Sequence, residues 1–375
     1  MTISNVQIGS IKALGKIEGF KHDVQMLCNA IDRVPMWQPG AGLRKQCDEV
    51  LRMIDHLEAR FERKLIVTII GPCGSGKSTL LNALAQVDNL SETGHRRPTT
   101  QSIVVLSREI KDADHLKEQL GVSQADMRSS PAAASLDHVM LIDTPDTDST
   151  QQKRHIHLVK NAIAVSDILI CMFDAENPKR KDHVDFLAHY VRLFNGDALV
   201  VVINKCDRQD KKELTQIIVP EFLEFIKTAW EKPIKKIFCI SARQHLQDPD
   251  WDSSAQPKHD FDELIDLKQM IFGTFNRPGY SIDRRIENAQ SLRDFILKEA
   301  TLETQKDSLT LKETKQRIRE AEKTALNAAL SAFKKGDSKR MIGINVLVYQ
   351  KLAQRWLGPV GWLIAIWARI LIFGT

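Results

Sequence analysis

The stretch Gly71-Pro72-Cys73-Gly74-Ser75-Gly76-Lys77-Ser78 decides the fold of this chain. It fits the pattern G-x-x-x-x-G-K-[ST], in which glycines let backbone N–H groups turn inward around a chain of phosphates. Residues 64–70 before it form an apolar run typical of a buried parallel strand, and residues 79–85 after it have the pattern of a helix. The N-terminus of that helix would add partial positive charge. The stretch therefore predicts a strand–loop–helix unit that binds a nucleoside triphosphate.

Two side chains of this loop have defined chemical roles in such a site. We expect Lys77 to reach the β- and γ-phosphates, and the Ser78 hydroxyl to bind Mg²⁺. The other loop residues expected to contact the nucleotide are Gly71, Cys73, Gly74, Ser75, Gly76 and Thr79. The predicted cofactors are thus a nucleotide and Mg²⁺.

The composition is that of an ordinary globular protein. The chain has 375 residues, 27% charged and 43% hydrophobic, which is enough for two or more domains. Its net charge of +5 suits an anionic nucleotide or a membrane surface, and we expect no DNA partner from so mild a charge. Six scattered cysteines without a C-x-x-C pair favour a reducing cytoplasm. The N-terminus has no apolar run of a secretory signal, so the predicted location is cytoplasmic.

Hydrophobic periodicity predicts an α/β domain with helical regions on either side. Residues 1–63 form a helical lead, in which prolines and glycines at 35–42 predict a turn between two helices. Residues 64–275 alternate apolar runs with helical segments, which predicts a mostly parallel sheet with helices on both faces. The polar stretch 111–135 is expected to be a helix and loop at the domain edge. The expected strands are 65–70, 102–106, 138–143, 168–174, 198–204 and 237–241.

Residues 281–340 differ in texture from the α/β domain. From 281 to 335 they contain no proline or glycine, and their apolar residues form stripes at helical spacing. This pattern predicts long amphipathic helices. They would form a stalk or a hairpin, and a helical cap on the α/β domain is the alternative.

Residues 341–375 are strongly hydrophobic. The apolar run Trp356–Phe373 is about as long as the shortest membrane-spanning segments. Gly358-Pro359 and Arg369 oppose a simple spanning helix and favour an interfacial or hairpin-like insertion. Basic residues precede the run, so residues 334–375 are predicted to meet an anionic membrane surface at its cytoplasmic face. The alternative is a pair of buried core helices.

An aspartate and a second motif follow later strands. Asp143 ends the third expected strand, where a carboxylate would hold Mg²⁺ opposite Ser78. Asn204-Lys205-Cys206-Asp207 follows the fifth expected strand. The Asp207 carboxylate would accept hydrogen bonds from the N1–H and the exocyclic amine of guanine, a pair that adenine does not offer. Lys205 would cover the face of the base, and Asn204 would brace the phosphate loop.

A third motif follows the sixth expected strand. It is Ser241-Ala242-Arg243, and the Ala242 N–H is placed for the guanine carbonyl. A buried carboxylate left unpaired by a wrong base is costly, so the set of motifs predicts selection of guanine.

Together these motifs resemble the Ras-like (TRAFAC) P-loop GTPase superfamily over about residues 64–275. The run 76–84, GKSTLLNAL, followed by Arg96-Arg97-Pro98-Thr99-Thr100, is most similar to the Era-like and dynamin-like branches. The resemblance implies a Mg²⁺-dependent enzyme that hydrolyses GTP to GDP and phosphate. It implies that Thr100, or Thr99 in another register, binds Mg²⁺ and senses the γ-phosphate. The helical flanks and hydrophobic segment also resemble the layout of bacterial dynamin-like proteins.

This chain lacks the residue that orients the attacking water in the superfamily. The superfamily glutamine would fall at Thr147 and is absent. One hypothesis makes Arg97 an arginine finger in cis, because it precedes Thr100 with the spacing of heterotrimeric G-protein α subunits. Arg96 and Arg97 forming only a solvated basic edge is the alternative. The second hypothesis is slow hydrolysis until a dimer supplies a group in trans.

Two functions follow as hypotheses. The first is a membrane-associated, nucleotide-dependent switch or self-assembling dynamin-like GTPase, a homodimer through its GTPase domain or stalk. The second is a soluble regulatory or RNA/ribosome-assembly GTPase. The C-terminal region has no GXXG loop and no RNP-like aromatic strand, which favours the first.

Overall fold

The computed structural model describes residues 5–91, 102–120, 125–145, 152–249, 256–334, 347–352, 354–355 and 361–367. The chain divides into two compact units, Met1–Ala300 and Thr301–Thr375.

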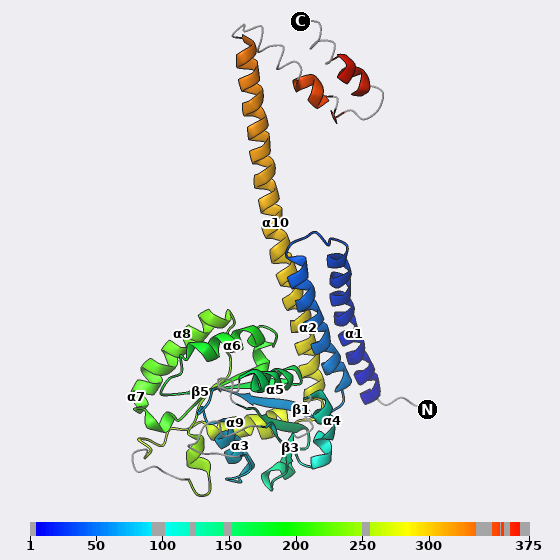
Figure 1. Cartoon of the computed structure of the whole chain (residues 1–375). Helices are drawn as coiled ribbons and strands as arrows, with labels where there is room; N and C mark the ends of the chain where they lie inside the picture. The colour runs from blue at the N-terminus through cyan, green and yellow to red at the C-terminus, as the bar shows by residue number, and fades with distance from the viewer. Residues whose placement is uncertain are drawn as a thin grey trace. The chain divides into compact units, whose positions relative to one another are not determined.

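The first unit contains a seven-stranded sheet with the order β3-β2-β4-β1-β5-β6-β7 (Figure 1). Every strand pair is parallel except β2 with β4, which is antiparallel. The prediction of a mostly parallel sheet is confirmed. The strands are β1 (Leu65–Ile70), β2 (Val104–Leu106), β3 (Asp126–Arg128), β4 (Val139–Asp143), β5 (Ile168–Asp174), β6 (Leu199–Asn204) and β7 (Ile237–Cys239).

The strands β1 and β6, which lie inside the sheet, are buried along their whole length. Strands covered on both faces are continuous apolar runs, which is why the sequence indicated them clearly. The edge strand β3 was not predicted, because the stretch 111–135 was expected to be a helix and loop. Its three residues, Asp-Met-Arg, are half-buried or exposed and carry two charges, so they lack the apolar pattern of a strand.

Helices cover both faces of the sheet, as predicted. On one face Val67 and Ile69 of β1 pack with residues of α3 and α9. On the other face the sheet packs with α2, α5, α6, α8 and the beginning of α10. Figure 1 shows α3 and α9 below the sheet and α5, α6 and α8 above it. The helices are α1 (Asn5–Asp32), α2 (Gly40–Ala59), α3 (Lys77–Ala85), α4 (Asp114–Gln119), α5 (Gln152–Ala164), α6 (Lys181–Val191), α7 (Lys211–Glu213), α8 (Val219–Trp230), α9 (Leu264–Gln269) and α10 (Tyr280–Lys334).

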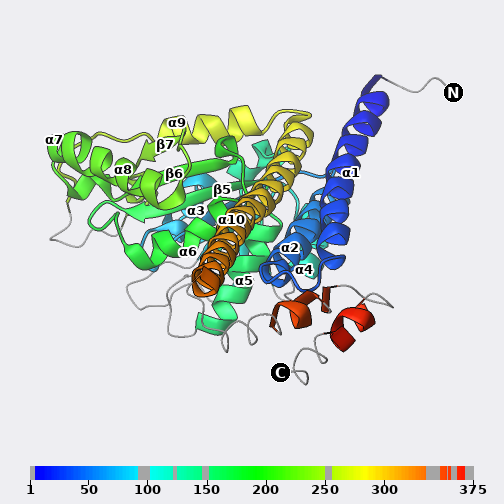
Figure 2. The same cartoon turned by 90° about the horizontal axis from the view of Figure 1, so that it is seen from above.

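The helical lead consists of α1 and α2, with the predicted turn between them. Both pack with the part of α10 that belongs to the first unit (Figure 2). There Arg293 forms an ion pair with Asp23 at 3.2 Å and lies over the ring of Phe20. The lead is therefore joined to the first unit by apolar and polar contacts.

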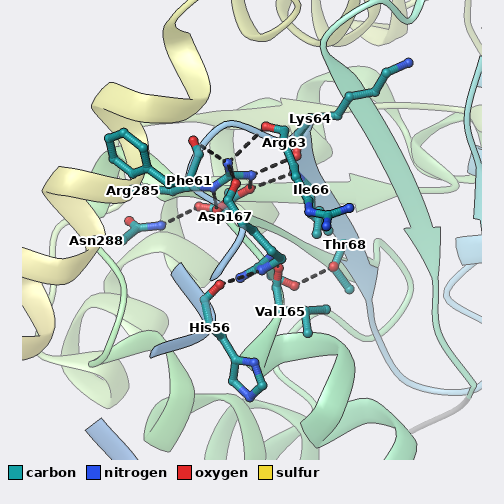
Figure 3. A network of polar contacts seen from close by, with 12 residues as sticks. His56, Phe61, Arg63, Lys64, Ile66, Thr68, Val165, Asp167, Arg285 and Asn288 are labelled. Carbon is teal, nitrogen blue, oxygen red and sulfur yellow. Dashed lines mark hydrogen bonds and ion pairs between the residues drawn. The ribbon is translucent and has the colours of Figure 1, made fainter. Parts of the chain in front are cut away.

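A buried ion pair connects α10 to the sheet (Figure 3). Arg285 Nη2 lies 2.8 Å from Asp167 Oδ2, and Arg285 Nε lies 3.0 Å from Asp167 Oδ1. Neither side chain is exposed. Asp167 Oδ2 also accepts the N–H of Ile66 at 2.8 Å, and Asn288 Nδ2 donates to the Asp167 carbonyl at 2.8 Å.

The same guanidinium holds the junction of α2 and β1. Arg285 donates to the carbonyl oxygens of Arg60, Phe61 (3.1 Å), Arg63 (3.0 Å) and Lys64 (2.8 Å). Burial lowers the pKa of Arg60 to about 10, while the charge of Asp167 opposes this effect. This network fixes the amino ends of β1 and β5, the opposite end of these strands from the phosphate loop.

In the second unit α10 continues without a break from Thr301 to Lys334. The structure therefore shows one helix and no hairpin among these residues. Its exposed apolar side chains are Leu302, Leu309, Leu311, Ile318, Leu326 and Leu330. Among the residues that the structure describes, no helix has the length and apolar character needed to cross a bilayer. Most of the predicted run Trp356–Phe373 lies outside these residues.

Candidate nucleotide site

The phosphate loop joins β1 to α3 and requires glycine for two reasons, a left-handed backbone conformation and the close approach of neighbouring atoms. Gly74 and Gly76 have φ values of +78° and +90°, the left-handed region that favours glycine. A Cβ at Gly76 would lie 2.1 Å from Asn204 Nδ2. A Cβ at Gly71 would lie 2.6 Å from Ser75 Oγ and 2.8 Å from Met172 Cβ. The sequence pattern thus reflects steric demands of this loop.

Lys77 begins α3 and is buried against the loop. Its Nζ donates to the carbonyl oxygens of Gly71 at 3.0 Å and Pro72 at 3.2 Å. Burial, and to a lesser extent the charge of Lys77, lowers the pKa of His183 to about 3. His183 at the start of α6 is therefore neutral near pH 7. Of these two side chains, Lys77 supplies the positive charge of the site.

Ser78 and Asp143 lie side by side, as a shared magnesium site requires. Ser78 Oγ donates to Asp143 Oδ2 at 2.7 Å, and both side chains are buried. A hydroxyl and a carboxylate are the hard oxygen ligands that Mg²⁺ prefers, so these residues fit the ion. Within the described parts of the chain no group of three His, Cys, Asp or Glu side chains could hold a metal. Nucleotide, water and the predicted ligand Thr100, which lies outside the described residues, would supply the remaining ligands.

The other predicted residues of this region lie outside the described residues. They are Arg97, Thr99 and Thr100, and the same is true of Thr147, the position of the missing superfamily glutamine. Their roles stay predictions. The same holds for both hypotheses on hydrolysis, the arginine finger in cis and the group supplied in trans.

Asn204, the last residue of β6, joins the phosphate loop to the 241–243 motif. Its Nδ2 donates to the Ser75 carbonyl at 2.9 Å, and its Oδ1 accepts the Ala242 N–H at 3.0 Å. The bond to Ser75 is the kind of contact by which Asn204 was expected to brace the phosphate loop. The Ala242 N–H, which the sequence assigned to the guanine carbonyl, donates to Asn204 in this structure. Its role toward guanine stays a prediction.

An ion pair and main-chain hydrogen bonds hold the residues predicted to bind the base. Lys205 has φ +64°, and its Nζ forms an ion pair with Asp174 at the end of β5. The N–H of Asp207 donates to Ser241 Oγ at 3.0 Å, and its carbonyl accepts the Lys258 N–H at 2.8 Å. These bonds use backbone groups of Asp207 and do not involve its carboxylate, whose role toward guanine stays a prediction.

Several residues that support the site were not predicted. Asp262 Oδ2 accepts the Ser241 N–H at 2.9 Å and lies 3.1 Å from His245 Nε2. Asp174 ends β5 as Asp143 ends β4, and this strand-end position is a signal that could have identified it. Ser91 contacts Asp143 and had no such signal, because it belongs to no motif. Arg243, predicted to contact the nucleotide, is half-buried in the turn after Ala242.

A mostly parallel sheet with a glycine loop at a helix N-terminus defines a P-loop nucleotide-binding protein. The family model of the elongation factor Tu GTP binding domain matches residues 62–296. This match spans more than half of the chain, so the chain belongs to that family of P-loop GTPase domains. The resemblance to Ras-like P-loop GTPases is thereby confirmed. No curated protein matches the chain.

Solved structures with a similar fold include bacterial dynamins and Era. A chain of an oligomerised bacterial dynamin pair has 18% identity and a TM-score of 0.42, covering 90% of this chain and 56% of that one. Aquifex aeolicus Era bound to GDP·AlF4⁻ has 19% identity and a TM-score of 0.39, covering 56% of each chain. LeoA, a bacterial dynamin GTPase from ETEC, has 13% identity and a TM-score of 0.36, covering 94% and 56%. This chain thus spans little more than half the length of these structures.

Proposed function

We propose that this chain binds GTP and GDP with Mg²⁺ and hydrolyses GTP to GDP and phosphate. The observation that carries the proposal is the position of Asn204, whose amide group bonds to both the phosphate loop and the 241–243 motif. One residue thus couples the part that would hold phosphates to the part that would hold a base. Membership of the GTPase family supports the same conclusion.

Each part of the site has a task in this reaction. The N–H groups of the loop and the N-terminus of α3 would bind the phosphates, and Lys77 would exchange its carbonyl partners for β- and γ-phosphate oxygens. Mg²⁺, held by Ser78 and Asp143 with Thr100, supplies charge neutralisation at the phosphates when bound. Arg97 would stabilise the transition state in cis, and a second protomer would do so in the alternative.

Selection of guanine is tested by changing the carboxylate of Asp207. In Asp207→Asn the amide would face the N1–H and amine of guanine with a donor, but xanthine carries a carbonyl in place of that amine. We expect GDP affinity to fall at least about tenfold and xanthosine diphosphate affinity to rise, measured by titration calorimetry. Asp210→Asn, an exposed helix cap three residues away, is the matched control. Unchanged GDP affinity in Asp207→Asn would contradict guanine recognition by this residue.

We further propose that the chain meets the cytoplasmic face of a membrane through residues 334–375 and self-associates through its GTPase domain or stalk. Trp362 and Trp367 are 74% and 55% exposed, and Lys351 and Arg355 are exposed basic residues close by in sequence. Exposed tryptophans together with basic side chains suit the interface of an anionic bilayer. In this proposal residues 1–63 are a helical lead, 64–275 the GTPase domain and 281–340 a stalk.

Co-sedimentation with vesicles of phosphatidylglycerol and phosphatidylcholine tests this role on the full chain. We expect wild type to sediment with the vesicles, and the double variant Trp362→Glu/Trp367→Glu to stay in solution. Met36→Glu removes an apolar side chain that is 95% exposed in the helical lead, and it should behave as wild type. Equal sedimentation of all three proteins would contradict the role. Salt-sensitive RNA binding without vesicle binding would favour the soluble RNA/ribosome-assembly alternative.

A further inference from the structure

Ser91 makes a second contact to the carboxylate expected to hold Mg²⁺. Its Oγ donates to Asp143 Oδ2 at 2.9 Å, the same oxygen that accepts the Ser78 hydroxyl at 2.7 Å. Ser91 is 1% exposed. One carboxylate oxygen thus accepts from two buried hydroxyls, one on α3 and one six residues after the end of α3.

Asn82 of α3 fixes the position of Ser91 through its backbone. Asn82 Oδ1 accepts the Ser91 N–H at 2.8 Å, and Asn82 Nδ2 donates to the Ser91 carbonyl at 3.0 Å. The side chain of Asn82 is fully buried. Because both bonds use main-chain groups of Ser91, they do not depend on its hydroxyl. The hydroxyl is left to act on Asp143.

We propose that Ser91 is a positioning residue for the magnesium site, an inference that rests on the proposed function. Its hydroxyl restrains the rotation of the Asp143 carboxylate, so that this group stays aligned with Ser78. Hydrogen-bond partners that orient a metal-binding group contribute to metal affinity. Ser91 also stands directly before residues 92–101, which contain Arg97 and Thr100.

The test measures how Mg²⁺ strengthens the binding of a fluorescent GDP analogue to the full chain. For Ser91→Ala we expect the Mg²⁺ concentration at half effect to rise roughly ten- to hundredfold. Affinity in EDTA should equal that of wild type, because the bonds to Asn82 persist. Ser91→Cys, which keeps a weak donor, should fall between the two.

Ser107→Ala is the matched control, because it also removes a buried hydroxyl. Ser107 Oγ donates to the Glu109 carbonyl at 2.7 Å, and Ser107 directly follows β2. It should show the wild-type dependence on Mg²⁺.

Two results would overturn the role of Ser91 while leaving the proposed function intact. One is a Mg²⁺ titration of Ser91→Ala that matches wild type, with wild type responding to Mg²⁺. The other is an equal loss of affinity with and without Mg²⁺, since that would indicate a purely structural effect. A wild-type chain that does not bind GDP, or binds it independently of Mg²⁺, would overturn both this inference and the proposed function.

Discussion

Replacing Arg285 should strongly destabilise the first unit, because this residue is the centre of a buried polar network. Arg285→Met keeps an unbranched side chain and removes the charge and all donors. Asp167 would then be a fully buried carboxylate, and among the described residues its side chain would keep only the hydrogen bond from the Ile66 N–H at 2.8 Å. The carbonyl oxygens of Phe61, Arg63 and Lys64 would each lose a donor.

The size of the effect follows from the loss of one partner of a buried ion pair. Such a loss costs about 3–5 kcal/mol, because it leaves an uncompensated charge in the interior. A typical domain is stable by about 5–15 kcal/mol, so the variant would lose a large fraction of its free energy of unfolding. Replacing both partners, as Arg285→Met/Asp167→Leu, should cost less than the sum of the single changes, because neither partner of the ion pair is left buried without the other.

Equilibrium unfolding in urea, followed by circular dichroism, measures these differences. Arg293→Met is the matched control on the same helix, since its ion pair with Asp23 is partly exposed. It should lose about 1 kcal/mol or less. An Arg285→Met variant that loses no more than Arg293→Met would refute the buried-network reasoning. The reasoning would also be refuted if the double variant lost as much free energy of unfolding as the two single variants together.

Three further predictions concern the site. Asn204→Ala removes the bonds to Ser75 and Ala242, so GDP affinity should fall at least about tenfold by titration calorimetry; unchanged affinity would contradict the coupling. Gly76→Ala places a Cβ 2.1 Å from Asn204 Nδ2, so nucleotide binding should be lost while circular dichroism shows a folded chain; retained binding would show that the loop can shift. The pKa of His183 is about 3 when folded against 6.5 ordinarily, so the unfolded chain binds more protons between these pH values and stability falls as pH drops. His183→Asn should remove about 2 kcal/mol of the loss between pH 7 and pH 5 in urea unfolding, and an unchanged loss would contradict it.

The parts of the fold predicted from sequence are those whose signal is local. The apolar runs of β1 and β5 gave the bounds 65–70 and 168–174, which the structure reproduces. A parallel strand covered on both faces is a nearly continuous apolar run, so its ends are visible in the sequence. The phosphate loop was equally clear, because its backbone conformation and close contacts require glycines at fixed positions within a few residues. The short strand β3 carries two charges and has no apolar run, so its sequence carries no signal of a strand and it was not predicted.

Contacts between distant residues could not be predicted. Arg285 and Asp167 are 118 residues apart, and neither belongs to a motif. Their pairing depends on where α10 crosses the amino ends of the strands, which is set by packing over the whole unit. Ser91 is similar, because an ordinary serine becomes notable only when Asn82 places it beside Asp143.

The most direct test of the account is phosphate release from GTP and ATP by the full chain with Mg²⁺. It should be measured at several protein concentrations, with Lys77→Ala beside wild type. We expect release from GTP and not from ATP, and its loss in Lys77→Ala. A rate per molecule that rises with concentration would indicate catalysis in trans. Equal release from ATP, or release by Lys77→Ala as fast as by wild type, would contradict a guanine-specific P-loop GTPase.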